Sequence, residues 1–378
     1  MAYVLFFGAI ALNLTCVFCK KQNKSIALVS LIMILFVMGF ASVKFGDLEV
    51  YYTYYQRSNF KLSRFEPGYI FINLFFANLG FNFNQFRIVI FVLCSLILYF
   101  ATKSITKNYN MVVLLYTITL FYFLTVALRF FIAFTFVVYA ASLLMKDKKK
   151  NIILFVLLIF VAAQFHASSY IALIYLLCMA NGKALKYINI FLTITSLVAL
   201  SFGFISMIMP NNISLLLSAL TRFFPSLLND GINYLSDFYL TGTYSRHYFI
   251  YVFFYLYNCI VSLLAASVLK THSVLNSTTV SKFNTIVLIH LSLSFLVLAS
   301  QTFIRLMFIP MFLGFLIFAK MTESDVLKVN TLQIRNIKMS ASITKIILIS
   351  TSLTWFVMLY LIGDLGFNLF WFLSNNML

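Results

Sequence analysis

Two arginines stand in stretches of the sequence that are otherwise apolar. Arg129 lies within "TVALRFFIAF", and Arg305 ends "SQTFIR" ahead of another apolar run. A guanidinium group is planar and always charged, and its N–H donors pair with the oxygens of phosphate or carboxylate groups. The alternative role is an anchor that reaches toward lipid headgroups. Because apolar sequence flanks both residues on both sides, we favour the binding of an anion.

Two further residues could move protons. His166 lies in "AAQFHASS", and Glu66 lies in "FEPGY". An imidazole titrates near neutral pH and a carboxylate accepts a proton from a hydroxyl, so each side chain is a candidate general base. Pro67 restricts the backbone of Glu66, which favours a fixed position for this carboxylate. A lone histidine is more often a hydrogen-bonded core residue, and this role stays the alternative for His166.

The sequence predicts no metal site. Asp47 and Glu49 in "GDLEVYY" stand two residues apart, a spacing that could bind a metal ion, but two carboxylates alone are weak evidence for a site. The cysteines of "CVFC", residues 16–19, lie in an apolar segment. We interpret them as small buried residues and not as a redox or zinc pair.

The composition of the chain is that of a polytopic membrane protein. Of its 378 residues, 63% are apolar and 10% are charged, whereas soluble domains hold about 45–50% and about 25%. No long polar block is present, so the chemistry must take place inside the membrane or at its faces. The net charge of +18 arises mostly from short Lys and Arg runs between apolar segments. This pattern is typical of cytoplasmic loops and not of a nucleic-acid-binding surface.

The apolar segments predict a single all-α transmembrane domain, residues 1–378, with about twelve spans. The expected spans are 2–19, 25–43, 86–102, 111–127, 129–145, 151–165, 167–181, 187–209, 247–269, 283–300, 303–319 and 343–362. The weaker segment 68–83 fits a re-entrant or interfacial helix on the outer side. Large external loops are expected at about 44–85 and 210–246, with both chain termini outside.

Basic clusters fix the orientation of these spans. Lysine-rich runs at 20–24, 146–150, 182–186 and 320–345 should be cytoplasmic. The segment 111–145 would extend about 52 Å as one helix, against a hydrocarbon core of about 30 Å, so it must fold back near Arg129. The same argument makes "QFHASS" the apex of the next hairpin. Counting crossings places both apices, and "SQTFIR", on the outer side.

The outer face therefore collects arginines, against the usual bias for basic residues on the inside. The count places there Asp47, Glu49, Arg57, Arg64, Glu66, Arg222, Arg246 and His247. The cytoplasmic clusters are nearly all lysine, whereas the external basic residues are mostly arginine. An outer-facing cavity for an anionic, phosphate-bearing ligand explains this distribution.

Four motifs in order, "GDLEVYYTYY", "FEPGYIFIN", "LRFFIA" and "AAQFHASSYIAL", resemble the EpsG-like and Wzy-type polymerases of bacterial O-antigen and exopolysaccharide synthesis. The resemblance covers roughly residues 40–180. In that family the arginine of the third motif is often followed by Gln, whereas Phe130 follows here. Beyond residue 180 the likeness is limited to a large external loop and a late arginine such as Arg305.

The resemblance implies a GT-C-like membrane glycosyltransferase in the bacterial inner membrane, with its active site facing the periplasm. Its substrates would be undecaprenyl-pyrophosphate-linked oligosaccharides. The growing chain would pass en bloc to the non-reducing end of a new repeat unit, with inversion at the anomeric carbon. A chain-length regulator and a flippase would be further partners, and neither a cofactor nor a metal is implied.

The same resemblance suggests roles for individual residues. The leaving pyrophosphate would be stabilised by Arg129, Arg305 and Arg222. Arg64, Arg246 and Asp47 would complete the substrate-binding set. The acceptor hydroxyl would lose its proton to His166 or Glu66, and His166 could instead contact the pyrophosphate.

Two other functions use similar chemistry. A flippase for the same lipid-linked sugar would need basic groups on both faces, but the sequence shows neither two-halved symmetry nor paired Gly- or Pro-broken helices. An O-antigen ligase would use the same donor and similar arginines. The early motifs favour the polymerase over both.

Overall fold

The computed structural model describes most of the chain and divides it into two compact units. The described residues are 1–19, 22–57, 65–146, 150–208, 244–271, 273–295, 304–323, 332–334, 337–339 and 369–376. The first unit comprises residues 1–174, 264–280 and 312–378, and the second comprises 175–263 and 281–311. The described residues are almost entirely helical, which confirms the expected helical fold class. The single transmembrane domain and its GT-C-like architecture stay predictions.

Most helices lie wholly within one unit. The first unit holds α1 (Ala2–Phe18), α2 (Lys24–Gly39), α3 (Leu48–Arg57), α4 (Pro67–Asn78), α5 (Phe83–Ile105), α6 (Tyr109–Thr119), α7 (Phe121–Val126), α8 (Leu128–Leu144), α9 (Lys150–Ala163) and α19 (Leu369–Ser374). The second holds α10 (Gly182–Ile208) and the short 3₁₀ helix η3 (Leu293–Phe295). Residues of both units form η2 (Ala167–Met179), α13 (Tyr244–Thr271), α14 (Ser277–Ser292) and α16 (Ile304–Met321).

Local signals explain where several helices begin. Asn23 caps α2, because its side chain accepts from the backbone N–H groups of Ser25 and Ile26. Asn82 and Gln85 form a capping box at the start of α5, each side chain bonding the other residue's backbone N–H. These caps satisfy N–H groups that the first turn of a helix cannot pair internally.

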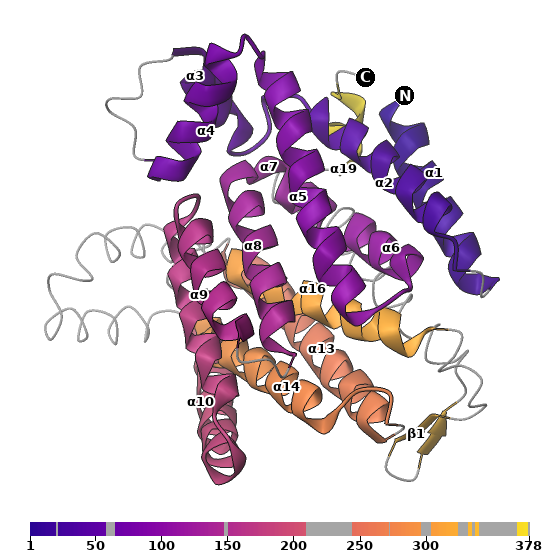
Figure 1. Ribbon diagram of the computed structural model, residues 1–378, viewed down its shortest axis with the longest axis vertical. Helices are drawn as coiled ribbons and strands as arrows, with labels where there is room; N and C mark the ends of the chain where they lie inside the picture. The colour runs from indigo at the N-terminus through magenta and orange to yellow at the C-terminus, as the bar shows by residue number, and fades with distance from the viewer. Residues whose placement is uncertain are drawn as a thin grey trace, which may run out of the picture. The chain divides into compact units, whose positions relative to one another are not determined.

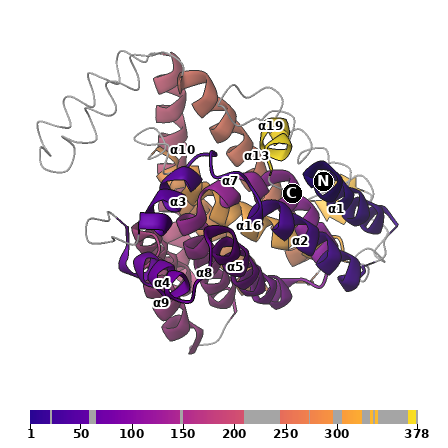
Figure 2. The ribbon, with the colours of Figure 1, turned by 90° about the horizontal axis from the view of Figure 1, so that it is seen from above.

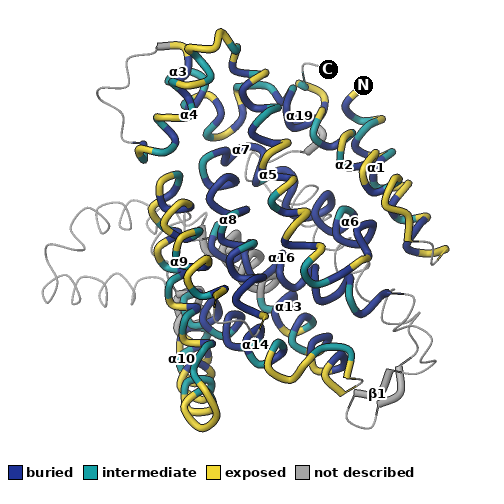
Figure 3. Tube along the Cα trace, viewed as in Figure 1, coloured by how far each residue is buried: buried dark blue, intermediate teal, exposed yellow. Residues whose placement is uncertain are grey.

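Helix α8 is the core of the first unit. Its sequence is apolar on all sides, and nearly all its residues are buried (Figure 3). It packs against α5 and α9, while α1, α2 and α6 pack with one another and α2 also contacts α5 (Figure 1). A helix that is apolar all round is stable only where neighbours or lipid surround it. Burial of α8 therefore holds its first turn, with Arg129, in a fixed place.

Several other helices expose large apolar side chains. Val29, Ile32 and Phe36 are exposed on α2, and Phe191 and Leu197 are exposed on α10. Apolar surface of this extent is what a bilayer covers. Two helices are long and apolar enough to cross a membrane alone, Phe83–Ile105 and the Gly182–Ser201 part of α10. The other apolar helical stretches found among the described residues, including the Asn258–Thr271 part of α13, have 10–17 residues.

The helices follow the expected spans closely, with two differences. The segment expected as one span at 111–127 is broken at Leu120 into α6 and α7. The segment expected at 167–181 forms the 3₁₀ helix η2 over 13 residues. At a rise of about 2.0 Å per residue this arm reaches about 26 Å, whereas an α-helix of the same length would reach about 20 Å.

Some expectations fall outside the described residues. These are the span at 343–362 and most of the loop at 210–246. The number of about twelve spans, the external termini and the re-entrant placement of 68–83 stay predictions. That last segment does contain a helix, α4, whose 12 residues extend only about 18 Å and cannot cross a bilayer alone.

One hairpin departs from the all-α expectation. Strands β1 (Leu332–Ile334) and β2 (Ile337–Met339) pair antiparallel, with Leu332 opposite Met339 and Ile334 opposite Ile337. Just two residues separate the strands, which is the commonest connection of a hairpin. The segment 320–345 was expected only as a basic cytoplasmic loop, although apolar and polar residues alternate at 332–334 and 337–339.

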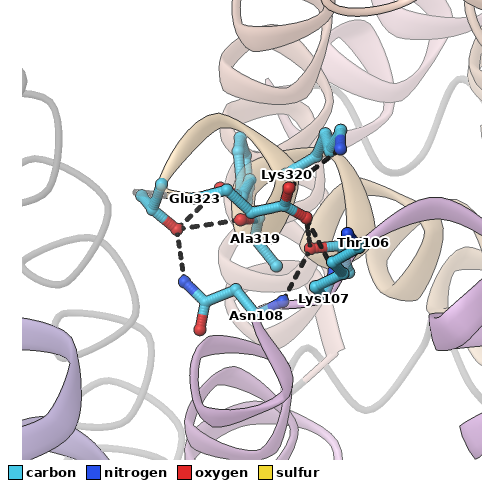
Figure 4. Close-up of polar contacts among 8 residues, drawn as sticks. Thr106, Lys107, Asn108, Ala319, Lys320 and Glu323 are labelled. Carbon is cyan, nitrogen blue, oxygen red and sulfur yellow. Dashed lines mark hydrogen bonds and ion pairs between the residues drawn. The ribbon is translucent and has the colours of Figure 1, made fainter. Parts of the chain in front are cut away.

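A polar cluster joins the α5–α6 turn to the end of α16 (Figure 4). The Glu323 carboxylate accepts from the Thr106 hydroxyl at 2.7 Å, the Lys107 backbone N–H at 2.6 Å and the Lys320 ammonium at 2.8 Å. The Asn108 amide also donates to the Thr322 hydroxyl at 3.0 Å. The span count that places Arg129 outside puts both of these segments on the opposite, lysine-rich face. Their contact is consistent with that count.

Candidate active site

Arg129 and Glu66 form an ion pair. The Arg129 Nη1 lies 2.5 Å from the Glu66 Oε2, and the two side chains are 17% and 19% exposed. Arg129 is the second residue of α8, which starts after a break at Ala127. Glu66 occupies the N-cap position of α4 without a capping side-chain bond, and its backbone is extended, φ −67° and ψ 148°, as Pro67 at the first helical position requires. Two residues expected to serve separate roles therefore bind each other.

Aromatic rings enclose the guanidinium. Its Cζ lies 4.4 Å from the ring centroid of Phe65 and 5.6 Å from that of Tyr51. The rings of Tyr51, Phe65 and Tyr69 pack on one another with centroids 5.4 to 5.8 Å apart. Cation–π contact holds the flat face of the Arg129 group, so its edge is directed at Glu66. The Tyr51 hydroxyl also donates to Asp47 Oδ2 at 3.4 Å, which connects the first motif to the pair.

The second oxygen of Glu66 reaches the turn between α9 and η2. Glu66 Oε1 accepts from the backbone N–H of Ala167 at 3.1 Å. The backbone N–H groups of Gly68 and Tyr69 donate to the Gln164 carbonyl at 2.9 and 3.3 Å. In Figure 1 α4 lies above the end of α9, and in Figure 2, seen from above, the two helices overlap, as these bonds require. The start of α4 is thus bonded directly to the apex that carries His166.

Gly68 makes this approach possible. A Cβ atom at this position would lie 2.7 Å from Gln164 Cβ and 2.8 Å from the Gln164 carbonyl oxygen. Both distances are shorter than any real Cβ contact, and the oxygen belongs to the backbone. A residue with a side chain would therefore push α4 away from the turn.

His166 lies in the same turn and is 9% exposed. Its Nδ1 is 2.7 Å from the Ser168 hydroxyl, and its ring packs edge-to-face on Phe130 at 5.6 Å. The contact with Ser168 fixes the ring orientation and couples the tautomer to the hydroxyl. Phe130, the residue after Arg129, supplies an apolar wall to the imidazole.

The cluster can hold an anion beside a carboxylate. The Arg129 Nε is buried and makes no hydrogen bond to any residue in the described part of the chain. Buried polar groups in proteins are nearly always paired, so the hydrogen-bonding capacity of this guanidinium is not fully used within the described residues. The partial exposure of both Arg129 and Glu66 gives such a ligand access.

Four other expected site residues lie in the second unit or outside the described residues and side chains. Arg305 is the second residue of α16 and belongs to the second unit. Arg246 is the third residue of α13, and its side chain is not described. Arg64 and Arg222 lie outside the described residues. Their binding roles stay predictions.

Sequence reasoning missed Arg87, which is 0% exposed. Its Nη2 donates to the carbonyls of Gly39 and Ala41 at 2.8 Å and to Asn84 Oδ1 at 2.7 Å. The carbonyls at a helix C-terminus carry partial negative charge, so Arg87 anchors α5 to the end of α2. The criterion applied to Arg129, apolar sequence on both sides, does not select Arg87, because Asn82, Asn84 and Gln85 precede it.

Two smaller features also differ from or extend the expectations. Cys16 is buried, but Cys19 is exposed, so the expectation of two buried cysteines is wrong for Cys19. The aromatic residues Tyr51 and Phe65 contact Arg129, and no sequence signal distinguishes them among 22 Tyr and 45 Phe.

Fold and site together define a helical membrane protein with an arginine and a carboxylate at a helix-turn cluster. A family model described as the EpsG family matches residues 27–334. The chain therefore belongs to the EpsG family, and the resemblance carried by the four motifs is confirmed. This membership makes it a polymerase-type membrane protein of polysaccharide biosynthesis. No curated protein and no solved structure matches the chain significantly.

Proposed function

We propose that the chain is a glycosyltransferase that polymerises undecaprenyl-pyrophosphate-linked oligosaccharide repeat units at the outer face of the bacterial inner membrane. The observation that carries the proposal is the Glu66–Arg129 pair bonded to the His166 turn. It supports the proposal because transfer from a lipid pyrophosphate needs a cation for the departing charge and a base for the acceptor hydroxyl.

The reaction replaces one bond at the anomeric carbon of the donor glycan. The acceptor hydroxyl oxygen, at the non-reducing end of the incoming repeat unit, forms a bond to that carbon. The bond from the carbon to the pyrophosphate oxygen breaks, and the lipid pyrophosphate leaves with the electron pair. The hydroxyl proton passes to a base on the protein. Attack opposite the leaving group inverts the anomeric configuration.

Arg129 would stabilise the pyrophosphate that leaves. Its guanidinium is held by Phe65 and Tyr51 and needs little reorganisation to meet the developing charge. Since Arg129 Nη1 is bonded to Glu66, a pyrophosphate would compete with Glu66 for that donor. Its binding would release Glu66 Oε2 to accept the acceptor proton.

This exchange gives the Glu66–Arg129 ion pair a role in the reaction in addition to any role in stability. The pair keeps both partly buried charges compensated, where an isolated charge would be costly. Glu66 stays in place through the Ala167 N–H on Oε1, which the exchange does not disturb. His166, one residue before Ala167, would orient the acceptor or contact the pyrophosphate. The arginines supply the compensating charge, so the proposal requires no metal ion.

The test is a set of Glu66→Gln, Arg129→Ala, His166→Ala and Arg305→Ala variants in the native host, with membrane protein levels checked by immunoblot. The glycan is extracted and separated on a gel. A normal protein level with a single repeat unit on the lipid anchor supports polymerisation. Unchanged ladders in all four variants would refute the proposed site.

The same gel distinguishes the rival functions. Long chains that accumulate outside but stay unattached would indicate an O-antigen ligase. Loss of surface glycan, with lipid-linked units retained inside the cell, would indicate a flippase. Asp47, Arg64, Arg222 and Arg246 would be tested next as substrate-binding residues by the same measurement.

A further inference from the structure

A cavity of about 500 Å³ lies between α3, the turn after α4 and the start of α5. This volume falls within the range of about 300–1,000 Å³ typical of small-molecule sites. We propose that the cavity is a binding subsite for an uncharged sugar residue of the glycan substrate. The inference rests on the proposed function, because the substrate is taken to be a lipid-linked glycan. The cavity would hold one sugar of that glycan.

The chemistry of the lining favours a sugar. Its walls carry the aromatic rings of Tyr52, Tyr55 and Phe83 and the amides of Gln56 and Asn84, and no lining residue is charged. A sugar ring offers an apolar face of C–H groups that packs on an aromatic ring, and a rim of hydroxyls that needs both donors and acceptors. A pyrophosphate would find no counter-charge on these walls.

The aromatic wall is rigid before any ligand binds. Phe83 packs against Tyr52 at 5.6 Å and against Tyr55 at 5.5 Å, and Tyr55 also stacks on Phe86 at 5.1 Å. The Tyr55 hydroxyl donates to the Phe81 carbonyl at 2.8 Å, which fixes that ring further. A surface already held in place loses little conformational entropy when a ligand binds.

Hydrogen bonds orient the polar groups of the cavity but leave some of their hydrogen-bond donors and acceptors unused. The Gln56 amide N–H donates to the Tyr52 phenol, so the phenol O–H and the Gln56 carbonyl can serve a ligand. Asn84 Oδ1 accepts from the buried Arg87 at 2.7 Å, which directs the Asn84 N–H groups elsewhere. No further partner of these groups is found among the described residues. They offer the donors and acceptors that hydroxyl and acetamido groups require.

Helix α3 links this cavity to the ion pair. Tyr51 packs on Phe65 and on Arg129, whereas its neighbour Tyr52 and Gln56 one turn later line the cavity. Two faces of one ten-residue helix thus contribute to a charged cluster and to an uncharged pocket. This arrangement suits a substrate whose pyrophosphate and sugar are recognised separately.

The experiment measures binding of a neutral, phosphate-free oligosaccharide, released by mild acid from the host's lipid-linked repeat unit. The full chain is held in lipid nanodiscs, and saturation-transfer difference NMR reports the bound sugar. Tyr52→Ala and Gln56→Ala should each weaken binding about tenfold, because each removes ring contact or a hydrogen-bond acceptor. Tyr52→Phe keeps the ring and should lose less. Tyr187→Ala, an exposed tyrosine of α10, is the matched control and should bind normally.

The outcomes separate this subsite from the proposed reaction. Arg129→Ala should bind the oligosaccharide normally while failing to elongate glycan in cells. If wild-type protein does not bind the oligosaccharide, or if Tyr52→Ala, Tyr52→Phe and Gln56→Ala all bind like wild type, the subsite is wrong, whatever the ladders show. If binding depends on Tyr52 but the Arg129 variant makes normal ladders, the sugar site stands and the reaction assigned to the ion pair fails.

Discussion

The carboxylate of Glu66 bridges Arg129 and the backbone of Ala167, accepting from Arg129 Nη1 at 2.5 Å and from the Ala167 N–H at 3.1 Å. One side chain thereby joins the start of α4, the start of α8 and the turn before η2. Three motifs that are far apart in the sequence meet at this carboxylate. The relationship predicts how variants of each contact should behave.

Arg129→Lys should fail to restore polymerisation. A lysine keeps the charge but loses the planar fork and the stacking on Phe65, which sets the direction of the donors. We expect polymerisation to fall about a hundredfold, as when a donor to a developing negative charge is removed. The measurement is the glycan ladder at matched membrane protein levels. A ladder close to wild type would mean that charge alone suffices and that the aromatic enclosure is irrelevant to function.

Gly68→Ala should separate α4 from the α9–η2 turn. The new methyl group would overlap the Gln164 backbone, at a cost of about 1–3 kcal/mol, so the unfolding temperature and the polymerising activity should both fall. Gly8→Ala is the matched control, because its Cβ would meet only the flexible end of Met33, at 2.9 Å. The unfolding temperatures of both variants, measured in detergent, test this prediction. Equal stability of the two variants would contradict the close packing at Gly68.

Ser168→Ala should slow the reaction without unfolding the protein. The substitution removes the hydroxyl that holds His166 Nδ1 at 2.7 Å. Loss of one such hydrogen bond predicts that the rate of polymerisation falls about threefold to tenfold. Ser104→Ala provides the comparison, since that hydroxyl bonds only the Ala101 carbonyl within its own helix in the described structure. A smaller effect for Ser168→Ala than for Ser104→Ala would argue that the orientation of His166 does not matter.

Glu323→Ala should reduce stability and spare the chemistry. Glu323 is 5% exposed, and its removal leaves the Thr106 hydroxyl and the Lys107 N–H without their acceptor. Because these buried donors would be left unsatisfied, the free energy of unfolding should fall by about 2–3 kcal/mol. The unfolding temperature should drop, while protein that remains folded at low temperature should still make long glycan. Glu49→Gln, at an exposed carboxylate of α3, serves as control. An unchanged unfolding temperature for Glu323→Ala would show that this cluster does not stabilise the fold.

The apolar pattern by itself determined the helical class and most helix positions. Segment 2–19 forms α1, 129–145 forms α8, and Glu66 has the extended backbone that Pro67 imposes. These features follow from forces that act over a few residues, namely burial of apolar runs and steric limits on the backbone. The arginines at turns were found for the same reason, because a charge next to an apolar run is visible locally.

Tertiary structure alone decided which of these residues meet. The pairing of Glu66 with Arg129, the enclosure by Tyr51 and Phe65, and the contact of Gly68 with Gln164 join segments separated by tens of residues. Hydrophobic burial, which drives the packing of the helices, is non-directional and carries no local signal of such partners. The 3₁₀ geometry of η2 likewise depends on its surroundings, because its apolar sequence suits an α-helix as well. The sequence therefore identified the chemical groups, and packing of the helices arranged them into a site.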